Sequence, residues 1–246
     1  MIEETLRKMH DMKLFSMADK LKELSVSDTY DKLSHAEVLA CLVDVEYDRR
    51  KNNHMTRLLR DARLKLPQAC VEDIEYTGKR NLKKDSFRDL LGCSFIQNRQ
   101  NILVSGPTGV GKTYIASALG NLACRNGFQT RYFRLSMFLE QVIADKRIGN
   151  YLKTIEKYGK VKLLILDDIG PDILTTEQRN IFLEIIEERH LTASTIITSQ
   201  LPFEQWYALF DEPTTADAVC DRVFHNAIKI NLKGESMRKN KQSPGT

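Results

Sequence analysis

Several features that define common protein classes are missing from this chain of 246 residues. Its apolar runs fall short of the roughly 18 residues that a membrane-spanning helix needs, and its charged first residues lack the apolar core of a signal peptide. None of the five cysteines forms a C-x-x-C pair, and no H-E-x-x-H motif occurs. We therefore expect a cytoplasmic protein without membrane association, whose thiols are reduced and mostly buried and do not bind a metal.

No Gly/Ser-rich linker interrupts the chain, although its first 90 residues differ in pattern from the rest. Apolar residues recur there at three- to five-residue steps, as they do on helical faces. Ser34 and Glu37 form a capping box that predicts a long helix from about Ser34 to about Ala62. We expect an all-α N-terminal domain over residues 1–90.

Strand and helix patterns alternate through the remainder, which we expect to be a second domain over residues 91–246, joined near residues 92–100. Ser136 is expected to cap a helix over 137–146, and Thr175 with Gln178 to open another over 175–190. Strands are predicted at 101–105, 130–135, 161–166, 195–198 and 227–232. This order predicts an α/β fold with a doubly wound parallel sheet.

The most informative segment is an uninterrupted match to the phosphate-loop motif G-x-x-x-x-G-K-[ST]. The predicted strand over 101–105 leads into it, and a predicted helix over 114–123 leads away, as the motif requires. N–H groups of such a loop converge on phosphate oxygens, the lysine binds the β- and γ-phosphates, and the threonine hydroxyl completes a Mg²⁺ shell. The candidate nucleotide-binding residues are Gly106, Pro107, Thr108, Gly109, Val110, Gly111, Lys112, Thr113 and Tyr114.

Two acids follow the apolar strand predicted over 161–166. Strand ends in such sheets point into the ligand crevice. Asp167 is expected to hold Mg²⁺ with Thr113, and Asp168 to polarise the attacking water as a general base. A pair of solvated acids in a turn is the alternative.

Three further polar side chains are candidates for contact with the γ-phosphate. Gln200 follows the strand predicted over 195–198, and its amide is suited to orienting a water. Arg222 and Arg238 flank the last predicted strand, and guanidinium groups suit phosphate because they are planar, fixed in charge and bidentate. A capped turn at Gln200 and surface salt bridges at the arginines are the alternatives.

Basic residues gather over 49–65 and over 79–84. A basic stripe on a helix neutralises DNA phosphates without reading sequence, whereas a solvated helix face is the alternative. Neither a helix-turn-helix nor a zinc finger is evident, so we expect weak sequence specificity. The candidate DNA-binding residues are Arg49, Arg50, Arg57, Arg60, Lys79 and Arg80.

Together these segments resemble the IstB family, the ATP-binding helper proteins of insertion-sequence transposition. These are AAA+ ATPases close to the DnaC-type replicative helicase loaders. The phosphate loop is generic, whereas Thr-Ser-Gln-Leu-Pro at 198–202 and Gly-Glu-Ser-Met-Arg at 234–238 are more specific, and the resemblance covers nearly the whole chain. It implies an AAA+ P-loop core preceded by an all-α domain.

The resemblance also implies roles for single residues. Gln200 takes the sensor position, Arg222 that of a trans-acting arginine finger, and Arg238 that of the second sensor arginine. The second acid is usually Glu in AAA+ proteins, and Asp168 is one methylene shorter. We therefore hypothesise slow intrinsic hydrolysis, below about one turnover per second without partners.

The function implied is ATP-dependent. The protein would bind Mg·ATP, self-assemble head to tail into a ring or helical filament, grip duplex DNA, and recruit and stimulate a transposase. It would cut no DNA, because no acidic cluster beyond the ATPase pair is evident. Rival interpretations are a DnaC-like helicase loader and a metabolic P-loop kinase, which DNA should not stimulate. A module that only binds nucleotide is disfavoured by the intact set of Lys112, Asp167 and Asp168.

Overall fold

A computed structural model describes residues 2–27, 32–76, 80–82, 84–170, 174–209 and 213–237. The chain divides into two compact units, residues 1–57 and residues 58–246. This division lies earlier than the boundary expected at residue 90, because the intervening residues bury apolar side chains in the core of the second unit. Those side chains are Leu58, Ala62, Leu64, Ala69, Val71, Ile74, Leu82, Phe87 and Leu90.

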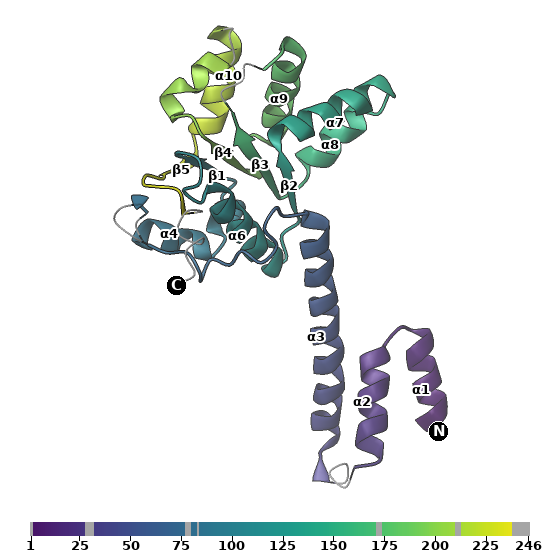
Figure 1. Ribbon diagram of the computed structural model, residues 1–246. Coiled ribbons are helices and arrows are strands. Elements are labelled where there is room, and N and C mark those ends of the chain that lie inside the picture. Colours follow the sequence, from purple (N-terminus) through teal and green to yellow (C-terminus); the bar gives the residue numbers. More distant parts are fainter. Residues whose placement is uncertain are drawn as a thin grey trace, which may run out of the picture. The chain divides into compact units, whose positions relative to one another are not determined.

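The first unit is helical. It contains α1 (Ile2–Asp11), α2 (Phe15–Ser25) and most of α3 (His35–Ala62), and Figure 1 shows α1 and α2 as an antiparallel pair. The capping box expected before α3 is present: the Ser34 N–H donates to the Glu37 carboxylate over 2.7 Å, and the Glu37 N–H donates to Ser34 Oγ over 3.3 Å. Both side chains thus satisfy N–H groups that the helix itself leaves unpaired.

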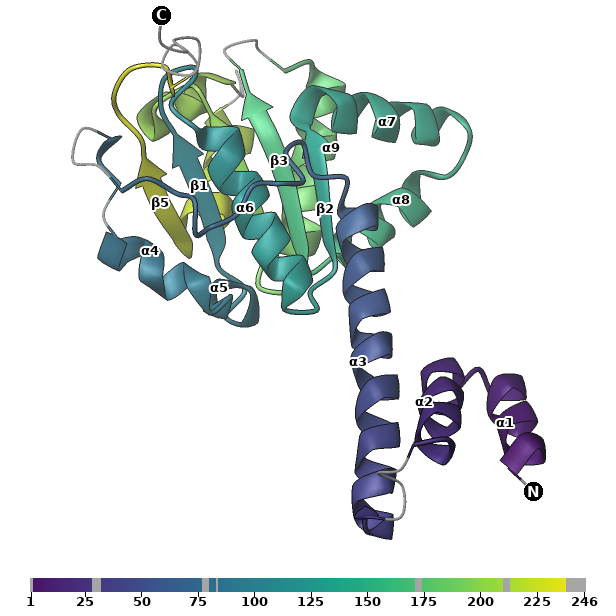
Figure 2. The ribbon, with the colours of Figure 1, turned by 60° about the horizontal axis from the view of Figure 1, so that its bottom comes forward.

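The second unit is built on a parallel sheet with strand order β2-β3-β4-β1-β5. This confirms the predicted α/β fold. Figure 2 shows α4, α5 and α6 in front of the sheet and α9 behind it. The strands are β1 (Asn101–Ser105), β2 (Thr130–Arg134), β3 (Leu163–Ile169), β4 (Ser194–Ser199) and β5 (Ala227–Asn231).

Helices cover both faces of this sheet. On one face, α4 (Lys84–Leu91), α5 (Ser94–Gln97) and α6 (Lys112–Arg125) share a core with residues 58–82. On the other face lie α7 (Leu135–Arg147), α8 (Tyr151–Gly159), α9 (Thr176–Arg189), the 3-10 helix η3 (Phe203–Leu209) and α10 (Pro213–Phe224).

The central strand β3 shows why the sequence adopts this layering. Leu163 and Ile165 pack into the core with α6, whereas Leu164 and Leu166 pack into the core on the opposite face. All four are fully buried. A run of aliphatic residues without alternating polar positions can satisfy burial only where both faces of the strand are covered.

Two local expectations need correction. Ser136 does not cap a helix: α7 begins at Leu135, and its N-cap is Arg134, which makes no side-chain cap hydrogen bond. The joint expected over 92–100 is not a polar turn, since it contains α5, whose Phe95 and Ile96 are buried. The capping box at Thr175 and Gln178 is confirmed.

Candidate active site

The phosphate loop joins β1 to α6, as its motif predicts. Gly109 and Gly111 adopt φ angles of 86° and 98°, in the left-handed region that favours glycine. Lys112 is 8% exposed, and its ammonium donates to the carbonyls of Gly106 and Pro107 over 2.7 and 2.8 Å. These two hydrogen bonds hold the Lys112 ammonium against the first residues of the phosphate loop.

The first acid of the pair is held by three neighbouring elements. Asp167 is 5% exposed and accepts hydrogen bonds from Thr113 Oγ1 at 3.0 Å, from Tyr132 Oη at 2.6 Å and from Thr198 Oγ1 at 2.5 Å. Burial and the hydrogen bond to Asp167 raise the pKa of Tyr132, so that this phenol remains a donor. The carboxylate is thus fixed beside the hydroxyl that the motif assigns to the metal.

Thr113 and Asp167 together suit a magnesium ion. A hydroxyl and a carboxylate are the hard oxygen ligands that Mg²⁺ prefers, and the ion usually keeps several waters. Their oxygens lie 3.0 and 3.1 Å apart at the phosphate loop. Among the residues that the structure describes, no group of three or more His, Cys, Asp or Glu side chains could form a separate metal site.

The second acid has a different environment. Asp168 has a φ angle of 67°, its N–H donates to Thr198 Oγ1 over 2.9 Å, and its carboxylate is partly exposed. That carboxylate lies 2.9 Å from the Arg134 guanidinium and accepts from the Gln200 amide over 3.0 Å. The carboxylates of the two adjacent acids therefore have different partners.

Gln200 connects this acid to the phosphate loop. Its Nε2 donates to Asp168, while its Oε1 accepts from Thr108 Oγ1 over 2.9 Å. The structure therefore brings the candidate sensor, the candidate base and a loop residue into one chain of hydrogen bonds.

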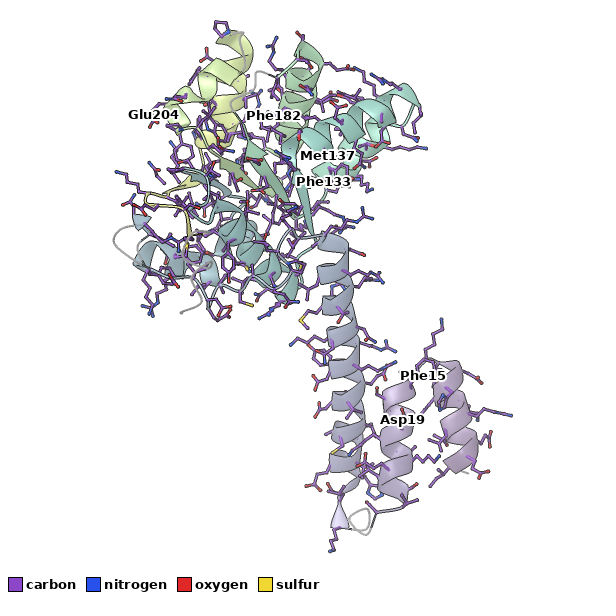
Figure 3. The ribbon with its side chains drawn as sticks, in the orientation of Figure 1. Phe15, Asp19, Phe133, Met137, Phe182 and Glu204 are labelled. Carbon is purple, nitrogen blue, oxygen red and sulfur yellow. The ribbon has the colours of Figure 1, made fainter. Side chains whose placement is uncertain are left out.

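Sequence reasoning missed two members of the site, Tyr132 and Arg134. They occupy alternate positions at the carboxyl end of β2, which pairs in parallel with β3. Phe133 between them, labelled in Figure 3, packs against Phe138 and Tyr158 on the other face. Parallel strands end at the same edge of a sheet, so polar residues at the end of the strand predicted over 130–135 should lie near Asp167 and Asp168. The alternating positions of Tyr132 and Arg134 could therefore have identified them as members of the site.

Arg222 does not join this cluster. It lies in the last turn of α10, where its guanidinium pairs with Glu187 over 2.9 Å. Its backbone carbonyl accepts from the side chain of Asn101, the first residue of β1. The phosphate loop follows the opposite end of the same strand.

Arg238 lies outside the described residues. The segment before it packs on the phosphate loop: the Met237 N–H donates to the Gly109 carbonyl over 3.0 Å, and a Cβ at Gly109 would collide with Ser236. Tyr114, in the first turn of α6, hydrogen-bonds through its hydroxyl with the backbone of Cys70 over 3.4 Å.

The candidate DNA-binding residues have different neighbours. Arg49 and Arg50 both pair with Glu46, over 2.7 and 2.8 Å. Arg57 contacts His54, and Arg60 pairs with Asp61 over 3.3 Å. Lys79 lies outside the described residues.

Arg80 lies at the phosphate loop. Its guanidinium donates to the Val110 carbonyl over 2.8 Å and to the Glu75 carbonyl over 2.9 Å. Its sequence neighbourhood indicated DNA, but its contacts are with the candidate nucleotide site.

Comparison with protein families gives a match over residues 7–245 to the family described as IstB-like ATP binding protein. A relative from Sinorhizobium fredii, named for an insertion sequence and for ATP binding, is 40% identical over 238 residues, which are 97% of each chain. One from Pseudomonas aeruginosa, named for insertion sequence IS21 and ATP binding, is 28% identical and covers 96% of this chain and 92% of its own.

Solved structures agree on the fold. A crystal structure of the DnaC helicase loader has a TM-score of 0.58 at 18% identity, covering 67% of this chain and 97% of that one. AMPPCP-bound DnaA from Aquifex aeolicus has a TM-score of 0.59 at 20% identity, covering 71% of this chain and 55% of that one. In the described part of the chain, no helix is both long and apolar enough to span a bilayer.

Proposed function

Since this chain belongs to the family of IstB-like ATP binding proteins and has an AAA+ ATPase fold, we propose that it assembles on duplex DNA with ATP and there recruits and stimulates the transposase of an insertion sequence. It is an ATP-binding AAA+ protein and an ATPase. The proposal concerns what this ATPase cycle controls. The relatives are named for insertion sequences, and a transposase is the enzyme that such elements require.

The hydrolytic step follows from the site. Lys112 supplies the cation for the β- and γ-phosphates, and the N–H groups of the loop cradle their oxygens. Thr113 and Asp167 would hold Mg²⁺, whose charge would stabilise the negative charge that develops on the phosphates. Asp168 orients and deprotonates the attacking water, while Gln200 positions that acid relative to Thr108. We assign Arg238 to the γ-phosphate as second sensor.

The position of Arg222 carries the proposal of head-to-tail assembly. Arg222 lies beside the first residue of β1, while the phosphate loop follows the last residue of that strand. A guanidinium in this position would contact the γ-phosphate of the nucleotide bound to a neighbouring copy of the chain. Such contacts are heterologous and close into rings or continue as helical filaments, so ATP at the junction would control assembly.

DNA contact is assigned to exposed cations of the helical region. Arg50, Arg57 and Arg60 are exposed, and within the described part of the chain they contact Glu46, His54 and Asp61 on their own helix. Cations of this kind bind phosphates without reading bases. The affinity for DNA should therefore fall steeply as salt rises. Arg49, which is partly buried, and Lys79, which lies outside the described residues, belong to the same proposed set.

Electron microscopy of the protein with duplex DNA tests the proposal. With ATP and Mg²⁺ we expect multimers on DNA, and with ADP we expect few. Lys112→Ala should abolish both nucleotide binding and assembly, with Lys153→Ala on α8 as the matched exposed-lysine control. A protein that stays a single protomer with ATP, Mg²⁺ and DNA together would overturn the assembly proposal.

The second candidate function is a helicase loader, which the structural similarity to the DnaC helicase loader favours. That similarity, at 18% identity, concerns the fold alone. Pull-down with an insertion-sequence transposase, against a replicative helicase in parallel, separates the two. Selective retention of the helicase would favour the loader.

A further inference from the structure

Two consecutive carbonyl groups of the phosphate loop are held from outside the motif. The Arg80 Nη2 donates to the Val110 carbonyl over 2.8 Å, and the Met237 N–H donates to the Gly109 carbonyl over 3.0 Å. One donor precedes β1 in the sequence and the other follows β5. The loop is therefore clamped on its outer side by two segments distant in sequence.

These bonds bear on where the loop's N–H groups point. The described peptide bonds are trans, and in a planar trans peptide the carbonyl and the following N–H point in opposite directions. Holding the Gly109 carbonyl outward thus directs the Val110 N–H inward, and holding the Val110 carbonyl outward directs the Gly111 N–H inward. Successive N–H groups that converge form an anion-binding nest.

Arg80 is itself held in place for this contact. Its carbonyl accepts from the Lys233 N–H over 3.1 Å, and its Nη1 donates to the Glu75 carbonyl over 2.9 Å. Its Nη2 lies 2.8 Å from the point that a Cβ on Gly111 would occupy. A side chain at Gly111 would therefore displace the guanidinium from this contact. The buried Nε of Arg80 has no hydrogen-bond partner within the described part of the chain.

We propose that Arg80 is a positioning residue of the nucleotide site. By holding the Val110 carbonyl outward, it orients the Gly111 N–H toward the phosphates and raises the affinity for di- and triphosphates. Its role is then in nucleotide binding, and not in the DNA contact that the neighbouring basic residues indicated.

Nucleotide affinities of four variants test this role. Arg80→Met removes the donors at similar length, Arg80→Lys keeps one donor, Met237→Pro removes the backbone N–H that holds Gly109, and Arg88→Ala is the control at an exposed arginine of α4. We expect Arg80→Met and Met237→Pro to weaken ADP and ATP about tenfold, the effect of one lost charge-assisted or fixed hydrogen bond. Arg80→Lys should retain most of the affinity, and Arg88→Ala all of it.

Competition with AMP gives a readout that a general loss of stability would not produce. AMP lacks the β-phosphate, so a misdirected loop should lower the ADP affinity and leave that of AMP unchanged. An equal loss for both nucleotides, or wild-type ADP affinity in Arg80→Met, would overturn the proposal.

Three further measurements complete the test. Since salt screens long-range charge, a loss that vanishes at high salt would show mere charge attraction and reject positioning. If nucleotide-free Arg80→Met binds DNA more weakly while its ADP affinity is unchanged, Arg80 contacts DNA and does not position the nucleotide site. Lys112→Ala should abolish nucleotide binding. This control shows that the assay reports nucleotide bound at the phosphate loop.

Discussion

The helical unit over residues 1–57 and the core unit over residues 58–246 each contain an arginine that donates to a distant backbone carbonyl, with different consequences. In the first, Arg49 donates to the Lys13 carbonyl over 2.9 Å and its guanidinium lies 5.2 Å from the centroid of the Phe15 ring. In the second, Arg80 donates to the phosphate loop. The same chemistry fastens helices in one unit and shapes a binding site in the other.

The two units also differ in what supports these contacts. The core unit buries its sheet between two apolar layers, which leaves strand ends free to carry polar groups. In the described part of the helical unit, few apolar side chains are buried; they include Ala18, Leu24 and Leu42. The charged residue Glu46 is buried in this unit as well. The polar network around Asp167 and Asp168 therefore shapes the nucleotide site of the core unit, whereas the ion pairs of Glu46 stabilise the helical unit. The following changes separate these roles.

The largest effect is expected from Arg222→Ala in the core unit. If Arg222 acts on the nucleotide of a neighbouring copy, hydrolysis by the assembled protein should fall about a thousandfold, as for arginine fingers, while nucleotide affinity of the free protomer stays unchanged. Steady-state ATPase assays with DNA measure this.

Mixing sharpens that prediction. Arg222→Ala and Lys112→Ala subunits each lack a different half of the proposed shared site. A mixture should regain part of the activity, because some junctions pair an intact loop with an intact arginine. Absence of any recovery in mixed assemblies would argue against action between copies.

Asp168→Asn should lower hydrolysis about a hundredfold or more, the range for loss of a general base, and leave ATP binding intact. The amide retains the size of the acid but cannot accept the proton of the attacking water. We expect ATP-dependent DNA complexes to persist longer than those of the wild type. If this variant hydrolyses ATP at the wild-type rate, Asp168 is not the base.

Tyr132→Phe should raise the Mg²⁺ concentration needed for ATP binding about tenfold, since partners that orient a metal ligand tune its affinity. Binding of nucleotide in excess EDTA should not change. Titration of Mg²⁺ at fixed ATP measures this, and Tyr158→Phe, a buried tyrosine of α8 on the other face of the sheet, is the matched control.

The smallest effect concerns the helical unit. Hydrogen bonds from Arg49 and Arg50 lower the pKa of Glu46 to about 2. Because this pKa lies below that of an unfolded glutamate, near 4.5, the contribution to stability is present above pH 4.5 and is lost as the pH falls toward 2. Allowing for the solvent exposure of Arg50, we expect about 1 to 2 kcal/mol.

Glu46→Gln tests this contribution and the comparison as a whole. Amide hydrogen exchange in α2 should become faster at pH 7. The change should be smaller at pH 3, because an unfolded glutamate is largely protonated there and the stabilising difference in pKa has begun to be lost. Nucleotide affinity should remain that of the wild type. A weakened nucleotide site in this variant would contradict the separation of roles between the units.

The sequence predicted the site where its parts are contiguous. Residues 106–113 form a local motif, and Asp167 with Asp168 ends an apolar strand, so periodicity and spacing were sufficient. The partners that β2 supplies to those acids were not predicted, because Tyr132 and Arg134 contact them only through the pairing of β2 with β3. The end of the first compact unit at residue 57 was not predicted for a similar reason: the helical pattern of the first 90 residues does not show which core the apolar side chains between residues 58 and 90 enter.

The amino-acid sequence by itself determined the nucleotide motif, the parallel sheet and the family, since each depends on residues that are close together or on a repeated pattern. Only the tertiary structure decided which arginine does what. A guanidinium is equally charged at Arg49, Arg80, Arg134 and Arg222, and its role depends on the carbonyl or carboxylate that folding places within hydrogen-bond distance.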